Sequence, residues 1–114
     1  MTDDNLHLIH ISECAARALS YVAKGREEFM LTALIQDAVI RNLQVLTESS
    51  QRISDSLQAQ HPEINWPQMA SFRNVLVHEY MKIDLNRVWK IIEQDLPILK
   101  NQVEAILKAR GVLK

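Results

Sequence analysis

Apolar side chains recur at three- and four-residue steps along most of the chain, the spacing of one buried helix face. The first such run follows Thr2, Asp3 and Asp4, whose side-chain oxygens suit a helix start. It continues to Gly25, which favours a left-handed stop. We therefore predict a first helix over about residues 4–24. Its buried stripe comprises Leu8, Ile11, Ala15, Ala18, Leu19 and Val22.

A longer run predicts a second helix that starts at Thr32 and ends near Gln60. A short helical turn of its own is expected before it, from Arg26 to Leu31. The stripe that the second helix buries comprises Ile35, Val39, Leu43, Leu46, Ile53 and Leu57.

Two further helices follow a loop at residues 61–65. The third is predicted from about Pro67, since proline is tolerated in a first turn, to Tyr80. Asp84 is a suitable cap for the fourth, which ends near Gly111 and which Pro97 is expected to bend. The fourth stripe comprises Val88, Ile92, Leu96, Leu99, Val103 and Ile106.

Short connections between amphipathic helices favour antiparallel neighbours. The pattern therefore predicts an all-α fold, an up-and-down four-helix bundle with a short extra helical turn between helices one and two. At 114 residues, with 47% hydrophobic residues but only two glycines and three prolines, the chain suits a single helical domain over residues 1–114.

The charge balance limits the possible partners. A formal net charge of -1 excludes a general polyanion binder, so any nucleic-acid contact must come from a local cluster of cations. A lone Cys14 makes no internal disulfide, and residues 1–4 lack the basic start of a secretion signal. No apolar run has membrane-spanning length, so we expect a cytoplasmic protein with no membrane partner.

Candidate chemistry is concentrated in residues 73–80, at the end of the third predicted helix. Arg73 supplies a permanent cation that can donate two hydrogen bonds to phosphate oxygens. His78 supplies a base of a type that titrates near neutral pH, and Tyr80 supplies a phenol. Chemistry on a phosphodiester needs such groups, so the run points to RNA cleavage.

Helical spacing divides these residues into two rows. At about 100° per residue, Tyr80 lies almost above Arg73, whereas Asn74 and His78 share a neighbouring stripe. Phe72, Val75 and Leu76 lie on the opposite arc and are expected to anchor the helix in the core. A twofold dimer would bring two copies of both rows together and complete a site that requires no metal. On spacing alone, a solvated helix face remains the alternative.

The same run resembles the Arg-x-x-x-x-His-x-Tyr signature of HEPN domains, and especially those of the HepT type, toxins found beside a small nucleotidyltransferase antitoxin of the MNT type. The resemblance covers nearly the whole chain. It extends to Asp37-Ala38-Val39-Ile40-Arg41-Asn42-Leu43, Ile64-Asn65-Trp66, Ile83-Asp84, Val88-Trp89-Lys90-Ile91-Ile92 and Leu96-Pro97.

This resemblance implies a homodimeric, metal-independent endoribonuclease without a cofactor. The substrate would be an RNA, either a tRNA or an mRNA. Its 2′-hydroxyl would attack the adjacent phosphorus and leave a cyclic phosphate. His78 would be the general acid or base, Arg73 would steady the phosphoryl oxygens, and Asn74 would hold a phosphate or orient His78. Glu48 would face the site from helix two. Here the chain departs from the family, because it has Thr47-Glu48-Ser49 where a Gly-Glu-Ala run is frequent. The alternative is that Glu48 is an acid on the helix surface.

The resemblance also implies regulation as in a type VII-like toxin-antitoxin system. The partner nucleotidyltransferase would install adenylyl groups on Tyr80, making a modified phosphoprotein. The added negative charge beside Arg73 would compete with RNA phosphate and switch the nuclease off.

Two rival functions stay open from the residues alone. In one, the domain is a non-catalytic nucleotide-binding or adaptor bundle in which Arg73 and His78 hold a phosphate. In the other, it serves mainly as the binding platform and substrate of its nucleotidyltransferase.

Other residue types with possible chemistry have plainer explanations. His7, His10 and Cys14 share one helix face, but structural zinc sites gather four ligands from several segments, so we expect a core thiol with two exposed histidines and no metal. His61 carries no argument for a ligand or base. The remaining candidates are four arginines, expected to be solvated helix residues with contact to RNA as the alternative, and two aromatic anchors of the core: Arg17, Arg26, Arg41, Arg52, Trp66 and Trp89.

Overall fold

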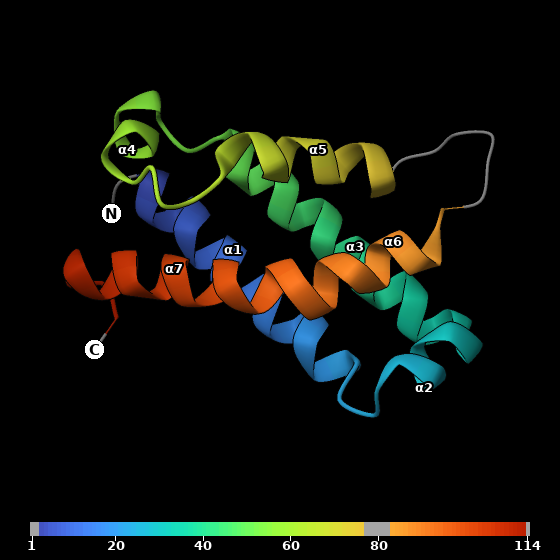
Figure 1. The fold of residues 1–114 in the computed structure, drawn as a ribbon. Coiled ribbons are helices and arrows are strands. Elements are labelled where there is room, and N and C mark those ends of the chain that lie inside the picture. Colours follow the sequence, from blue (N-terminus) through green and yellow to red (C-terminus); the bar gives the residue numbers. More distant parts are fainter. Residues whose placement is uncertain (1–2, 77–82, 114) are drawn as a thin grey trace.

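The computed structural model describes residues 3–76 and 83–113, and all regular elements in these ranges are helical (Figure 1). The expected end of the third helix, including His78 and Tyr80, lies outside the described residues. The elements are α1 (Asp3–Tyr21), α2 (Arg26–Leu31), α3 (Ala33–Gln51), α4 (Asp55–Gln60), α5 (Trp66–Leu76), α6 (Leu85–Lys90), the π-helical segment η1 (Ile91–Asp95) and α7 (Leu96–Ala109).

The long helices alternate in direction and form a bundle. Figure 1 shows α5 beside the continuous rod of α6, η1 and α7, with α1 and α3 crossing behind them. The most extensive packing joins α1 to α3, while α7 covers α1 and α5 covers α3. The all-α four-helix architecture expected from the periodicity is therefore confirmed.

The core is built from the predicted stripes. All six apolar residues of the fourth stripe are buried, and the stripes of the first two helices are buried except at Leu19, Val22 and Ile35, which pack at its margin. Burying one such aliphatic side chain stabilises the fold by about 1.5–3 kcal/mol. The regular spacing thus accounts for the association of the helices.

The second predicted helix is wrong in one respect, because it does not run unbroken to Gln60. It breaks after Gln51, and Ser54 caps a separate α4 by accepting a hydrogen bond from Leu57 N at 3.2 Å. The Asp4 carboxylate holds this break by accepting bonds from Ser54 N at 2.8 Å and Ser54 Oγ at 2.6 Å. Ile53 and Leu57 remain buried on both sides, which is why the apolar spacing did not reveal the break.

The first predicted helix also ends early, at Tyr21, and is followed by a turn. Gly25 has φ 98°, the left-handed region that glycine adopts without strain. The separate helical turn expected at Arg26 to Leu31 is confirmed as α2. Gln36 Nε2 closes its end by donating to the carbonyl oxygens of Phe29 and Met30, at 2.9 and 3.1 Å.

The fourth helix begins and ends as predicted but changes form in between. The Asp84 carboxylate caps α6 by accepting from Asn86 N and Arg87 N, and Gly111 follows α7 with φ 75°. Where a bend was expected at Pro97, a π-helical turn precedes the proline, with Leu96 N–H donating to Ile91 O. Such turns accommodate the hydrogen bond that proline does not make.

Within the described part of the chain, none of the helices is both long and apolar enough to cross a membrane.

Candidate active site

The helix α5 sets the direction of the candidate side chains. Asn65 caps its start, with Oδ1 accepting from Gln68 N at 3.0 Å, and Pro67 occupies the first turn. Phe72, Val75 and Leu76 are buried, as expected. This anchor leaves the intervening pair, Arg73 and Asn74, exposed to solvent.

Arg73 lines a hollow of about 240 Å³ on the α3 side of α5, together with Gln44, Thr47 and Glu48. Gln44 Nε2 donates to Leu76 O at 3.3 Å, and Thr47 Oγ1 donates to Gln44 O at 2.8 Å, so the wall of the hollow is tied to both helices. We call this the α3-side hollow. Among the described residues, Arg73 forms no ion pair or hydrogen bond.

Asn74 lines a different cavity, the α6-side groove of about 400 Å³. Ser71 and Asn74 contribute from α5, and Arg87 and Lys90 contribute from α6. Adjacent residues of one helix therefore open into separate cavities, and the structure does not bring Asn74 together with Arg73. It does bring Glu48, an exposed acid, to the same hollow as Arg73.

His78 and Tyr80 lie outside the described residues, and a single copy of the chain is described. The pairing of His78 with Arg73, and the assembly of two copies around one linkage, therefore stay predictions.

The histidine and cysteine row of α1 differs in part from the expectation. Cys14 is buried, which raises the pKa of its thiol, and His10 is exposed. His7 is half-buried rather than exposed, and its Nδ1 has no hydrogen-bond partner among the described residues. No cluster of three metal-ligating side chains occurs in residues 3–76 and 83–113.

The four arginines for which RNA contact was the alternative are all exposed, and two of them have protein partners. Arg17 lies 3.4 Å from Glu13, and Arg26 Nη2 donates to Asn86 Oδ1 at 2.7 Å, which ties α2 to α6. Arg41 and Arg52 are exposed on or beside α3. None of the four lines the α3-side hollow or the α6-side groove.

Both tryptophans pack against the core as anchors, as expected. Trp66 opens α5 and donates from Nε1 to His61 O at 3.1 Å. Trp89 lies against Phe29, with ring centroids 5.5 Å apart.

His61 acts locally on an exposed acid. Its Nδ1 lies 3.1 Å from Glu63 Oε2. A hydrogen bond from the backbone of Glu63, together with this contact, lowers the pKa of Glu63. The pair stabilises the loop before α5.

Sequence reasoning missed four residues that line the two cavities: Gln44 and Thr47 beside Arg73, and Arg87 and Lys90 beside Asn74. The spacing of Arg87 and Lys90, three residues apart after the Asp84 cap, was a usable signal, since it puts two cations on one helix face. No comparable signal marked Gln44 or Thr47, because polar residues on a helix are common.

Comparisons with known proteins place this arrangement in a family. The family described as Ribonuclease HepT-like matches residues 11–106. "Probable ribonuclease HepT" of Thermococcus cleftensis is 38% identical over 82 residues, 72% of this chain and 74% of that protein. "Putative RNase MJ1380" of Methanocaldococcus jannaschii is 37% identical over 79 residues, 69% of this chain and 72% of that protein.

A third relative is longer than this chain. "Gamma-glutamylcyclotransferase and putative RNase MJ0434" of the same organism is 27% identical over 93% of this chain, which corresponds to 48% of that protein. No solved structure matches significantly. The family match nevertheless spans α3, α5 and the rod that faces them, and the chain therefore belongs to the HepT-like family of ribonucleases.

Proposed function

We propose that this protein is a metal-independent endoribonuclease whose active site is completed by a second copy of the chain. The observation that carries the proposal is the exposed guanidinium of Arg73, which has no ion pair among the described residues, lining the α3-side hollow on a helix held by three buried neighbours. A fixed cation at an open surface suits a phosphodiester, because bidentate hydrogen bonds from arginine match phosphate oxygens.

The reaction is an internal transesterification of RNA. A general base takes the proton of the 2′-hydroxyl, and the 2′-oxygen attacks the adjacent phosphorus. The bond from phosphorus to the 5′-oxygen breaks, a general acid protonates the leaving oxygen, and the products carry a 2′,3′-cyclic phosphate and a 5′-hydroxyl. The two His78 side chains of a dimer supply the base and the acid, while Arg73 stabilises the charge that grows on the phosphoryl oxygens.

Two further side chains position the substrate. Asn74 holds a phosphate or orients His78, with which it shares a predicted helical stripe. Glu48, which shares the α3-side hollow with Arg73, accepts a hydrogen bond from the ribose. Both act by holding the strand in line for attack, so their loss slows cleavage less than the loss of Arg73.

Regulation follows from the position of Tyr80 in the same run. A partner nucleotidyltransferase transfers the adenylyl group of ATP to the Tyr80 oxygen, with release of pyrophosphate and the phenolic proton. The bound phosphate then competes with RNA for Arg73. The pair acts as a toxin and its antitoxin, on tRNA or mRNA in the cytoplasm.

Cleavage without metal is tested with purified protein and total cellular RNA in EDTA. The unchanged protein is expected to leave cyclic phosphate ends, and His78→Ala and Arg73→Ala are expected to leave the RNA intact. Arg52→Ala, which removes an exposed arginine outside both cavities, is the matched control and retains activity. Bound but uncut RNA with the unchanged protein would instead favour a non-catalytic binding bundle.

Modification is tested by intact-mass spectrometry after incubation with the partner and ATP. The protein is expected to gain adenylate mass, and Tyr80→Phe is expected to gain none. An equal gain by Tyr80→Phe would move the modification to another residue and contradict the proposed switch.

A further inference from the structure

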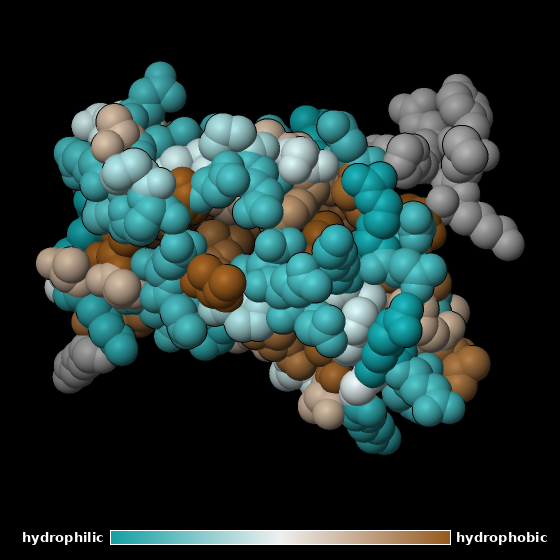
Figure 2. Space-filling model, in the orientation of Figure 1, coloured by the Kyte–Doolittle hydropathy of each residue, from teal (hydrophilic) through white to brown (hydrophobic). Residues whose placement is uncertain are grey.

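Two connected hollows lie between α5 and the rod formed by α6, η1 and α7, on the side of α5 away from Glu48. The larger is the α6-side groove, and the smaller has a volume of about 130 Å³. Gln68, Phe72 and Asp95 line both, so the two form one path along α5. Figure 2 shows apolar surface in this hollow, bordered by hydrophilic side chains over both helices.

The charge of the larger hollow suits a polyanion. Arg87 and Lys90 are exposed one helical turn apart, and neither forms an ion pair with any described residue. Asp95 is the one acid among the described residues that line the larger hollow. It also lines the smaller hollow, and it accepts a hydrogen bond from Gln68 Nε2 at 3.4 Å. The end of the groove near Asn74 therefore presents two exposed cations and an amide to phosphate oxygens.

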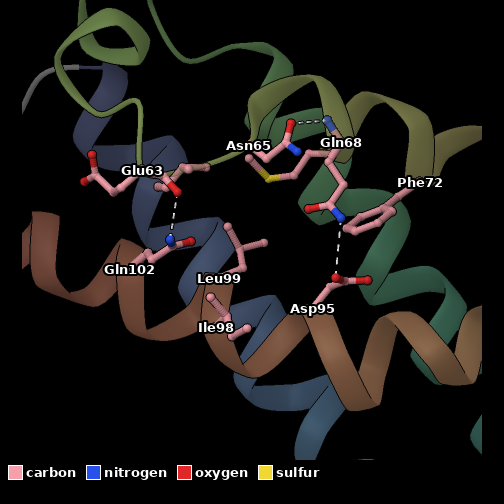
Figure 3. Close-up of a pocket in the computed structure, with 10 residues that line it drawn as sticks. Glu63, Asn65, Gln68, Phe72, Asp95, Ile98, Leu99 and Gln102 are labelled. Atoms are coloured by element: carbon pink, nitrogen blue, oxygen red, sulfur yellow. Dashed lines mark hydrogen bonds between the residues drawn. The ribbon is translucent and has the colours of Figure 1, made fainter.

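The small pocket has a different chemistry, with amide and acidic side chains beside apolar wall (Figure 3). Gln102 Nε2 donates to Glu63 O at 2.9 Å, and Gln68 Nε2 donates to Asp95, so the amide oxygens of Gln68 and Gln102 are left for a ligand. The second oxygen of Asp95 joins them. Phe72 and Leu99 supply apolar wall, and Ile98, 59% exposed, stands at the rim.

The pocket's size and acceptors select among nucleobases. An engineered cavity of about 150 Å³ holds a benzene ring, so about 130 Å³ has room for one six-membered ring. Of the two pyrimidines in RNA, cytosine presents an amino group at N4, which a carboxylate accepts, whereas uracil presents an oxygen at that position. Phe72 provides a face for stacking.

From these observations we propose that the path between α5 and the rod binds the single-stranded RNA next to the cut, with a backbone phosphate on Arg87 and Lys90 and a cytosine in the pocket at Asp95. This inference rests on the proposed ribonuclease function. It assigns strand holding to the α6 side of α5 and the Arg73 contact with the scissile phosphate to the α3 side.

The phosphate contact is tested in the cleavage-deficient His78→Ala protein, by titrating a fluorescent uridine decamer at several salt concentrations. Adding Arg87→Gln and Lys90→Gln is expected to weaken binding about tenfold at low salt. The slope of log affinity against log salt should become shallower by about 1.4, because two single-strand phosphate contacts are lost. The matched control, Lys24→Gln with Lys108→Gln, removes the same charge outside the groove and is expected to leave the slope unchanged. Equal slopes for both pairs would overturn the proposal.

The base contact is tested with a decamer in which the central uridines are replaced by cytidines. The His78→Ala protein is expected to bind it roughly tenfold tighter than the uridine decamer. Asp95→Asn, which keeps an oxygen to accept from Gln68, is expected to reduce this preference to about twofold or less. No preference in the protein with Asp95 intact would overturn the base pocket.

The outcomes separate this inference from the ribonuclease itself. If the protein cuts RNA but the groove variants bind and cut normally, the groove proposal fails and the ribonuclease stands. If no RNA is cut but binding depends on Arg87 and Lys90, the groove stands and the ribonuclease fails. If the groove variants instead lose only the nucleotidyltransferase partner, the surface binds protein and the proposal is wrong.

Discussion

The two sides of α5 differ in the chemistry that they offer to a ligand. The α3-side hollow is small and presents one arginine with one carboxylate, Arg73 and Glu48. The α6-side groove is larger, presents two cations with amides, and continues into a smaller pocket with amide and acidic side chains. One residue along α5 separates the two cavities, since Arg73 lines the α3-side hollow and Asn74 lines the α6-side groove. Neighbouring residues in a catalytic motif need not share a cavity.

The difference originates in what each side packs against. A residue step of about 100° turns Arg73 toward α3 and Asn74 toward α6. Phe72 and Leu76, both buried, fix that rotation by holding α5 in the core. The buried arc holds the helix, and the proposals place the Arg73 contact on the α3 side and strand holding on the α6 side, each with its own test.

The largest effect is expected from Arg73→Ala, which removes the cation of the α3-side hollow. Cleavage should slow by about 10²–10³-fold, the usual loss when a preorganised donor to a developing charge is removed. Binding to the uncut decamer should change less than for the variant of Arg87 and Lys90. Single-turnover kinetics and titration check the two quantities separately. A loss confined to binding would make Arg73 another holding residue.

Leu76→Ala tests the buried arc between the two sides. It should lower the free energy of unfolding by about 2–5 kcal/mol, because Leu76 is 1% exposed and the cavity left behind is not refilled. Denaturant unfolding followed by circular dichroism measures this loss. Ala70→Gln, at an exposed position of α5, is the control and should stay within about 0.5 kcal/mol. Similar losses for both would contradict the anchoring role of the arc.

Glu48→Ala sharpens the account of the α3-side hollow. If Glu48 positions the ribose, cleavage should slow about fivefold, equivalent to one hydrogen bond of about 1 kcal/mol. The affinity for the uridine decamer should not fall, since removing a negative charge beside Arg73 favours phosphate. Faster or unchanged cleavage would identify Glu48 as a surface acid only.

The smallest effect is expected far from both sides, at the contact between Asp4 and Ser54. Burial acts to raise the pKa of Asp4, but hydrogen bonds from the Ser54 side chain and backbone outweigh it, and the pKa is lowered from 3.8. The carboxylate therefore stabilises the fold above the unfolded pKa, and this contribution is lost as the pH falls through the folded pKa.

Asp4→Asn should accordingly cost about 0.5–1 kcal/mol at neutral pH and progressively less in acid. Denaturant unfolding across the acid range measures the difference. Cleavage at neutral pH should be unchanged, because Asp4 lines neither cavity. A difference that persisted in strong acid would show that the charge of Asp4 is not what stabilises the break between α3 and α4.

The helices and their buried faces were largely predictable from the sequence. Apolar spacing located the stripes of α1, α3 and α7. The Asp84 side chain indicated the cap, and the glycine at position 25 indicated a left-handed turn. The break at residues 52–54 was not predictable, since Ile53 and Leu57 keep the helical period across it. It depends on a bond from Ser54 to Asp4, fifty residues away.

The candidate site divides in the same way. The local order of residues determined that Phe72, Val75 and Leu76 face inward while Arg73 and Asn74 face outward, because a helix fixes the angle between neighbours. Only the tertiary structure decided that Arg73 lines the same hollow as Glu48, and that Asn74 lines the same groove as Arg87 and Lys90. These cavities join segments far apart in sequence, and their composition depends on which helices pack together and at what rotation.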